Sequence, residues 1–290
     1  MRRVIAALVF ATFLASPARA QELVHFPSLN DNGAGQPPTM LDGYLYRPTA
    51  SGRRPAVLLL HGCGGLLLRS TGWINRREQE WAATFTARGW TVLMVDSFRP
   101  RGTVQMCAPA DYDEAIVRKR PLDVYGALAF LRAQPAVRGD RIAMIGWSQG
   151  GGTVLRSIAA DSLDRPKTLP QGDFRAAVAF YPALCDPHRQ SPSWTNAVPL
   201  LVLTGAEDVW TPAAPCRALI EAATARGAGI DLQVYPGAYH DFDVPGLARQ
   251  EMPQFRTRSG VVPIEGTDPA ARADVFARVP AFLARYLDAP

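Results

Sequence analysis

Short apolar segments recur along this chain at regular intervals, and most of them end at glycine, proline or aspartate. Six form nearly continuous apolar runs, at residues 55–60, 90–96, 141–146, 176–181, 200–205 and 232–236. Runs of this length are typical of strands that are covered on both faces of a sheet. Two shorter segments precede them, at residues 22–26 and 42–47, and we expect these to be edge strands.

Helical patterns separate the apolar runs. Residues 121–134 place apolar side chains on one stripe at spacings of three. Helices are also expected at residues 75–88, 150–160, 213–226 and 268–287, the last kinked by Pro280. The alternation predicts an α/β fold, with a doubly wound, mostly parallel sheet and helices on both faces. Ligands bind at the carboxyl ends of strands in such sheets, so the residues just after each run are candidates for a site.

The first 20 residues have the features of a secretory signal peptide. Residues 1–3 carry positive charge, residues 4–14 are apolar apart from one threonine, and small residues flank Arg19 before Gln21. The apolar run is too short to cross a bilayer, which disfavours an uncleaved anchor. Arg2 and Arg3 suggest a twin-arginine signal only weakly. We therefore predict cleavage after Ala20 and a secreted or periplasmic protein.

Composition limits the remaining possibilities. Residues 21–290 contain no linker or repeat and are expected to form one domain without a stable membrane span. Without the basic residues of the leader, the excess of basic over acidic residues falls from five to two, which disfavours a nucleic-acid-binding protein. Four cysteines in an exported chain are compatible with two disulfides, and none forms a CxxC pair that would favour a metal cluster.

Candidate chemistry begins at the sequence Gly146-Trp147-Ser148-Gln149-Gly150. It follows the run at 141–146 and precedes a helical segment, which is the strand–turn–helix context of a nucleophile elbow. The turn is so tight that small residues are required two positions before and after the nucleophile. Ser148 is therefore predicted to be a strained catalytic residue whose hydroxyl is exposed.

A serine needs a base to take its proton, and elbows of this kind are followed by the acid and then the histidine. His240 follows the last strand and is the predicted base. The predicted acid is Asp208, at the end of the run 200–205, with Glu207 as its rival. Asp96 also ends a strand but precedes Ser148, so we interpret it as a turn residue.

A tetrahedral intermediate needs donors aimed at its oxyanion. The sequence His61-Gly62-Cys63-Gly64-Gly65 follows the first strong run and is a loop of the type that contributes one backbone N–H. We assign that donor to Cys63 and a second to Gln149, the residue after the nucleophile. His61 is predicted to stabilise the loop rather than act as a base.

These motifs together resemble the dienelactone hydrolase family of the α/β-hydrolase superfamily. The resemblance also includes the segment 95–102 and the sequence Tyr239-His240-Asp241-Phe242, and it runs from about residue 40 to the C-terminus. It implies the α/β-hydrolase fold, hydrolysis of small esters or lactones, and no cofactor. The named dienelactone hydrolases have a cysteine nucleophile, so Ser148 moves the interpretation from dienelactones toward a serine esterase.

The sequence allows more than one role for the candidate substrate contacts and more than one pairing of the cysteines. Trp147, Trp210 and Tyr239 flank the predicted triad and are candidates for pocket walls, with core packing as the alternative. Arg101 is a candidate for binding a substrate carboxylate, with a structural role as the alternative. Four cysteines allow three pairings, of which we favour Cys63 with Cys107 and Cys185 with Cys216 because all four lie near the functional edge.

Two other functions remain as alternatives. A peptidase would use the same triad on the same fold. A catalytically inactive binding protein would have no need of Ser148, Asp208 and His240 in this order. The sequence does not indicate the natural substrate, the oligomeric state or the role of residues 245–265.

Overall fold

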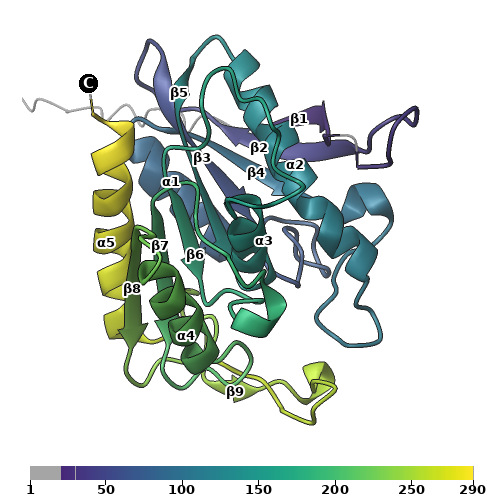
Figure 1. Ribbon diagram of the computed structural model, residues 1–290, viewed down its shortest axis with the longest axis vertical. Coiled ribbons are helices and arrows are strands. Elements are labelled where there is room, and N and C mark those ends of the chain that lie inside the picture. The colour runs from purple at the N-terminus through teal and green to yellow at the C-terminus, as the bar shows by residue number, and fades with distance from the viewer. Residues whose placement is uncertain (1–20, 30, 290) are drawn as a thin grey trace, which may run out of the picture.

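The structure is a computed structural model that describes residues 21–29 and 31–289. The predicted signal peptide, residues 1–20, lies outside the described residues. Figure 1 shows one large sheet with helices packed on both of its faces, as the apolar pattern predicted.

Eight strands form this sheet in the order β1-β2-β4-β3-β5-β6-β7-β8. Their bounds are β1 (Glu22–Pro27), β2 (Met40–Tyr46), β3 (Arg54–Leu60), β4 (Thr91–Asp96), β5 (Val137–Trp147), β6 (Ala177–Phe180), β7 (Leu200–Gly205) and β8 (Ile230–Tyr235). Strands β3 to β8 run parallel, and β1 and β2 are antiparallel to their neighbours. The segment predicted at 42–47 is therefore not an edge strand, because β2 pairs with both β1 and β4.

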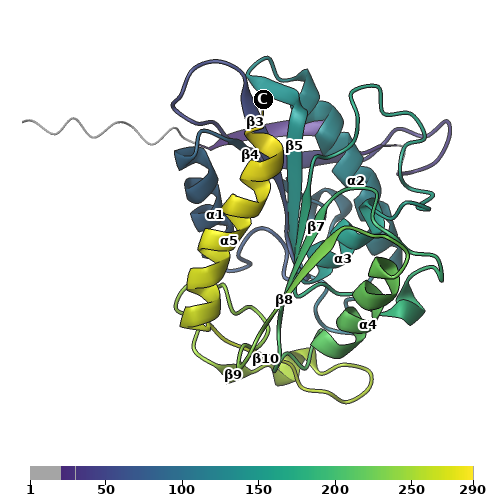
Figure 2. The same cartoon turned by 60° about the vertical axis from the view of Figure 1, so that its left-hand side comes forward.

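Within the residues that the structure describes, five α-helices cover the sheet. They are α1 (Arg76–Ala87), α2 (Glu114–Ala133), α3 (Gln149–Ser157), α4 (Ala213–Thr224) and α5 (Pro269–Leu287). Figure 2 shows the sheet nearly edge-on, with α1 and α5 on one side and α2, α3 and α4 on the other. Successive residues of β3 face opposite layers: Val57 and Leu59 belong to the core under α1 and α5, and Leu58 and Leu60 to the other core.

Helix α2 begins seven residues before its predicted start at residue 121. The Asp113 side chain caps it by accepting hydrogen bonds from the N–H groups of Ala115 and Ile116. Pro121 lies inside the helix and lacks an N–H to donate. The cap and the buried side chains of the first two turns outweigh that loss.

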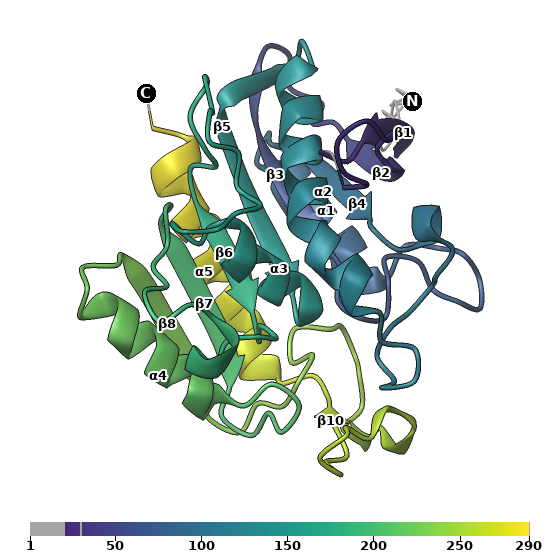
Figure 3. The same ribbon diagram turned by 45° about the vertical axis from the view of Figure 1, so that its right-hand side comes forward.

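Loops at the carboxyl ends of the parallel strands gather at one end of the molecule. There the strands β9 (Gln250–Glu251) and β10 (Ile264–Glu265) pair as a small hairpin around a 3-10 helix, Pro253–Phe255. Figure 3 shows this hairpin below the ends of the central strands. The N–H of Gly266 donates to the His240 carbonyl at 3.0 Å, which fixes the hairpin beside the predicted base. Among residues 21–29 and 31–289, no helix is long and apolar enough to span a membrane.

Candidate active site

Ser148 lies in a sharp turn between β5 and α3. Its backbone has φ 51° and ψ −113°, in the region that side chains other than glycine rarely adopt. A Cβ added to Gly146 would lie 2.2 Å from the Gly150 carbonyl oxygen, and one added to Gly150 would lie 2.2 Å from the Leu60 carbonyl oxygen. Only glycine fits at both positions, which is the physical basis of the motif read in the sequence.

The predicted acid and base are in direct contact. Asp208 Oδ2 lies 2.7 Å from His240 Nδ1, and both side chains are buried. The N–H groups of Trp210 and Thr211 donate to Asp208 Oδ1 at 2.8 and 2.9 Å, and the Thr211 hydroxyl donates to Oδ2 at 2.8 Å. Glu207, the rival candidate, is exposed. The carboxylate is therefore fixed by four donors and holds the imidazole in one orientation.

The environment of His240 favours its charged form. Burial disfavours the imidazolium, but the Asp208 carboxylate, together with Asp241 and Glu265, outweighs that cost and raises the pKa of His240 above its ordinary value. The rings of Tyr181 and Trp210 pack on the imidazole with centroids 4.5 and 4.9 Å away. Because Nδ1 faces Asp208, Nε2 is the atom that is free to take a proton.

Ser148 and His240 line the same cavity. Within the described residues no hydrogen bond joins the Ser148 hydroxyl to the imidazole. Such bonds often tighten only when substrate is bound, so this unliganded arrangement is compatible with general-base chemistry.

The loop after β3 passes directly beside the serine. A Cβ added to Gly62 would lie 3.5 Å from Ser148 Cβ. The N–H groups of Cys63 and Gln149 donate to no acceptor among the described residues. Two such donors beside a nucleophile are suited to bind an oxyanion.

His61 holds this loop in place. Its Nε2 accepts a hydrogen bond from the Ser97 N–H at 3.2 Å, so Nδ1 carries the proton and donates to the Gly62 carbonyl at 2.8 Å. Burial, followed by the charge of Arg120, lowers the pKa of His61 well below its ordinary value. A neutral histidine with both nitrogens occupied has the loop-stabilising role predicted from the sequence. Asp96 likewise has its predicted turn role, because its Oδ1 accepts hydrogen bonds from the N–H groups of Phe98 and Arg99.

Arg120 is not among the candidate residues that the sequence patterns indicate. It projects from α2, is fully buried, and donates to Gln149 Oε1 at 2.8 Å and to the His61 carbonyl at 2.7 Å. Its burial lowers its pKa to about 10, and its guanidinium lies over the Phe98 ring, 5.3 Å from the centroid. Arg120 thereby links the two segments that carry the candidate oxyanion donors.

Asp243 likewise holds side chains around the site in place. Its carboxylate is buried and accepts from Trp81 Nε1 at 3.2 Å, Trp147 Nε1 at 2.9 Å and the Tyr181 hydroxyl at 2.6 Å. Trp147 is consequently a packing residue beneath the serine and lines none of the cavities described below. Asp243 thus anchors Trp147, the residue before Ser148, and Tyr181, whose ring packs on His240.

The structure brings only one of the other predicted substrate contacts to the site. Trp210 lines the cavities around Ser148. Tyr239 instead stacks under Arg249, whose guanidinium lies 4.2 Å from the ring centroid. Arg101 is directed away from the site and pairs with Asp123 at 2.7 Å and Asp31 at 2.8 Å, so it has a structural role rather than the substrate contact considered above.

Two cavities meet at Ser148. One, of about 410 Å³, extends between the loop 106–112 and α4, and the other, of about 790 Å³, extends between α1 and the 240–265 segment. Phe255, from the 3-10 helix of the hairpin, lines both. Residues 245–265 thus contribute to the walls of both cavities. The described residues contain no group of three or more His, Cys, Asp or Glu side chains that could hold a metal ion.

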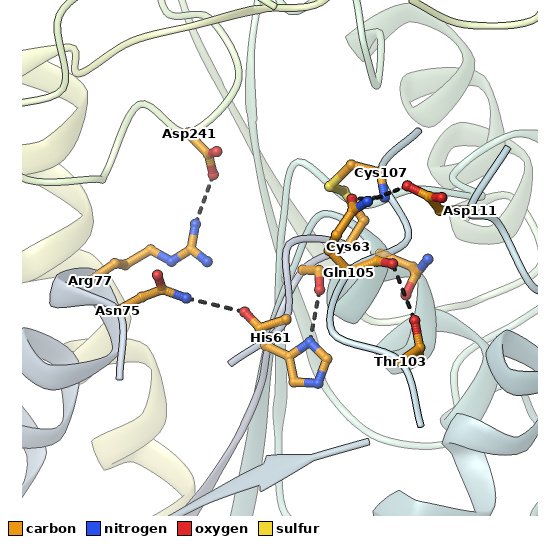
Figure 4. Close-up of a disulfide and its surroundings, with 12 residues drawn as sticks. His61, Cys63, Asn75, Arg77, Thr103, Gln105, Cys107, Asp111 and Asp241 are labelled. Atoms are coloured by element: carbon orange, nitrogen blue, oxygen red, sulfur yellow. Dashed lines mark hydrogen bonds and ion pairs between the residues drawn. A yellow bond between two sulfur atoms is a disulfide. The ribbon is translucent and has the colours of Figure 1, made fainter. Parts of the chain in front are cut away.

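Both favoured disulfides are present. Cys63 is bonded to Cys107, and Cys185 is bonded to Cys216. The first joins the candidate oxyanion loop to the loop after β4, and the N–H of Met106 also donates to the Cys63 carbonyl at 2.8 Å. Figure 4 shows this disulfide opposite the ion pair of Arg77 and Asp241.

Two known proteins are similar to this chain in sequence. In sequence the chain is similar to a Bradyrhizobium protein named "Probable 2-oxo-3-(5-oxofuran-2-ylidene)propanoate lactonase", with 25% identity over 211 residues that cover 69% of this chain and 77% of the relative. It is also similar to the quorum-quenching protein AidA of Acinetobacter baumannii, with 30% identity over 120 residues, 41% of this chain and 36% of that protein.

Solved structures share the fold. A dienelactone hydrolase-like promiscuous phosphotriesterase, P91, from metagenomic libraries, has a TM-score of 0.64 at 20% identity, with 92% of this chain and 99% of that chain covered. Esterase 2 of Thermogutta terrifontis, phosphorylated by paraoxon, has a TM-score of 0.63 at 18% identity, with 97% and 100% covered. The model of the dienelactone hydrolase family matches residues 41–287. The chain therefore belongs to the dienelactone hydrolase family and is a hydrolase that acts on ester bonds.

Proposed function

We propose that this protein is an exported serine esterase that cleaves small carboxylic esters or lactones through an acyl-enzyme on Ser148. The observation that carries the proposal is the contact of Asp208 with His240 on a cavity that also contains the strained Ser148. A buried acid–base pair beside an elbow serine has the parts that acyl transfer requires.

The proposed reaction has two halves. His240 Nε2 takes the Ser148 proton as Oγ attacks the ester carbonyl, and the oxyanion is bound by the N–H groups of Cys63 and Gln149. The imidazolium is stabilised by Asp208 and protonates the departing alcohol. Water activated by His240 then hydrolyses the acyl-enzyme, which regenerates Ser148 and releases the acid.

Export is supported by two independent features. The charged and apolar leader is typical of secretory signals. The two disulfides, Cys63–Cys107 and Cys185–Cys216, are typical of proteins that fold in an oxidising compartment. We propose a secreted or periplasmic enzyme on these grounds.

The first test is labelling of the folded mature protein with a fluorophosphonate probe, followed by peptide mapping. We expect modification at Ser148 that is lost in Ser148→Ala and strongly slowed in His240→Ala. Hydrolysis of p-nitrophenyl butyrate should be lost in the same variants. A folded wild-type protein that neither labels nor hydrolyses the ester would instead support the binding-protein alternative.

A further inference from the structure

The two cavities at Ser148 differ in which catalytic groups they contain. Their shared wall is formed by Cys63, Cys107, Ser148, Trp210 and Phe255. Gln149, a proposed oxyanion donor, lines only the cavity of about 410 Å³, and His240, the proposed base, lines only the cavity of about 790 Å³. An ester bound across Ser148 would place its two halves in different cavities.

The chemistry of acylation decides which half goes where. As the bond from Ser148 Oγ to the carbonyl carbon forms, the bond from that carbon to the alcohol oxygen breaks. The leaving oxygen receives the proton that His240 took from Ser148, so the alcohol must lie on the His240 side. The acyl chain stays attached to Ser148 and must extend the other way, into the smaller cavity.

Fewer charged side chains line the smaller cavity than the larger one: Asp186, Arg189 and Arg258 against seven in the larger. The apolar part of its wall includes Met106, Tyr112, Val117, Pro182 and Leu184, with Phe255 from the hairpin. The arginines that line it, Arg189 and Arg258, are exposed. Its volume lies at the lower end of the range for small-molecule pockets, which suits an acyl chain of medium length.

The larger cavity is lined by charges of both signs. Arg69 and Arg76 are exposed on one part of its wall, and Glu265 is half-buried on another. Asp241, held by Arg77 at 2.7 Å, and the Cys63–Cys107 disulfide both line it, and Figure 4 shows the two on opposite sides of the view. An apolar occupant that covered these charged groups would remove their water without replacing its hydrogen bonds, so this cavity suits an alcohol with several hydrogen-bonding groups.

We propose that the natural substrates are esters of a medium-length apolar acid with a polar alcohol of the polyol or sugar type. The acid occupies the cavity of about 410 Å³ and the alcohol the cavity of about 790 Å³. This assignment rests on the proposed function, because it requires acylation of Ser148.

A matched pair of substitutions tests it. Ala183 lines only the smaller cavity and Ala108 only the larger one, and both are partly buried. Ala183→Phe and Ala108→Phe therefore add the same side chain to opposite sides of Ser148. Two substrate series are assayed: p-nitrophenyl esters of acids from acetate to decanoate, and butyrate esters of hexanol, glycerol and glucose. Rates of deacylation are measured by single-turnover kinetics.

We expect Ala183→Phe to shift the optimum to shorter acids and to lower kcat/KM for the longest accepted acid by about 10- to 100-fold. Ala108→Phe should leave the acid profile and the deacylation rate unchanged, because the alcohol has left by then, and should lower kcat/KM for the glucose ester. Wild type should prefer glycerol and glucose esters to hexyl ester by about 10-fold. If Ala183→Phe does not fold, Tyr112→Ala, at an exposed position, should instead extend the accepted acid length.

The assignment would be overturned if Ala108→Phe changed the acid profile, or if wild type preferred the hexyl ester. In either case the proposed esterase activity would be unaffected. A wild-type enzyme that hydrolyses no ester in either series would overturn the proposed function, and this assignment with it. The activity of wild type toward p-nitrophenyl butyrate separates the two failures.

Discussion

The Cys63–Cys107 disulfide should contribute to catalysis as well as to stability. Cys63 carries a proposed oxyanion N–H, and the disulfide fixes it to the loop after β4. In Cys63→Ala/Cys107→Ala the N–H remains while the covalent link is removed. Cys185→Ala/Cys216→Ala is the matched control, because it removes a disulfide that lies near the site without being attached to a proposed donor.

The two double variants should lose similar stability. The disulfides join residues separated by 44 and 31 positions, so the chain-entropy relation assigns each about 4 kcal/mol. Their effects on catalysis should differ. Loss of a whole oxyanion donor slows kcat by roughly 10²- to 10³-fold, and a donor that is present but less well positioned should cost part of that. The Met106 N–H to Cys63 carbonyl bond, at 2.8 Å, retains some of the positioning.

We therefore expect kcat to fall by about 10- to 100-fold in Cys63→Ala/Cys107→Ala and by less than about threefold in the control. KM should change little in the first variant. The assay is hydrolysis of p-nitrophenyl butyrate, at a temperature where circular dichroism shows both variants to be folded. Equal kcat values in wild type and Cys63→Ala/Cys107→Ala, or an equal loss in both double variants, would refute the reasoning.

Three further results are expected. Asp208→Asn should lower kcat by about 10³- to 10⁴-fold, because the amide no longer stabilises the imidazolium; an ester assay showing less than a tenfold loss would contradict this. Because the pKa of His240 is raised, lowering the pH should reduce kcat/KM at a higher pH than it would for a base with an ordinary histidine pKa. In Asp208→Asn the midpoint of this decrease in the pH profile should move to lower pH. Gly150→Ala should abolish soluble expression, since the added Cβ lies 2.2 Å from the Leu60 carbonyl oxygen; a folded, active Gly150→Ala enzyme would exclude this reading of the elbow.

The amino-acid sequence by itself determined the features that depend on local order. Apolar runs followed by glycine or aspartate located the parallel strands, and the glycines around Ser148 located the turn. Chain order selected Asp208 as the partner of His240, and their side chains are in contact. The strands and the turn follow from residues close together in the chain, where backbone sterics and the repeat of a strand act directly. The pairing of Asp208 with His240, 32 positions apart, follows instead from the order in which the triad residues occur along chains with this elbow.

Other features follow from residues that meet only after folding. Arg120 lies 29 positions from Gln149 and 59 from His61, and Asp243 lies 162 from Trp81, so no local pattern indicated these contacts. Arg101, a candidate for a substrate contact from the sequence, pairs with Asp31, which lies 70 positions away. A buried charge is stable only beside its partners, and those partners are chosen by the packing of distant elements.

The shapes of the cavities also depend on residues that meet only after folding. Trp210 follows β7, Phe255 comes from the hairpin and Cys63 from the loop after β3, yet all three form the wall between them. The volume and charge of a cavity depend on the distances between side chains from separate loops, and a local sequence pattern does not specify those distances. Local order thus determined which chemistry the chain carries, and tertiary packing decided the shape and polarity of the site in which it occurs.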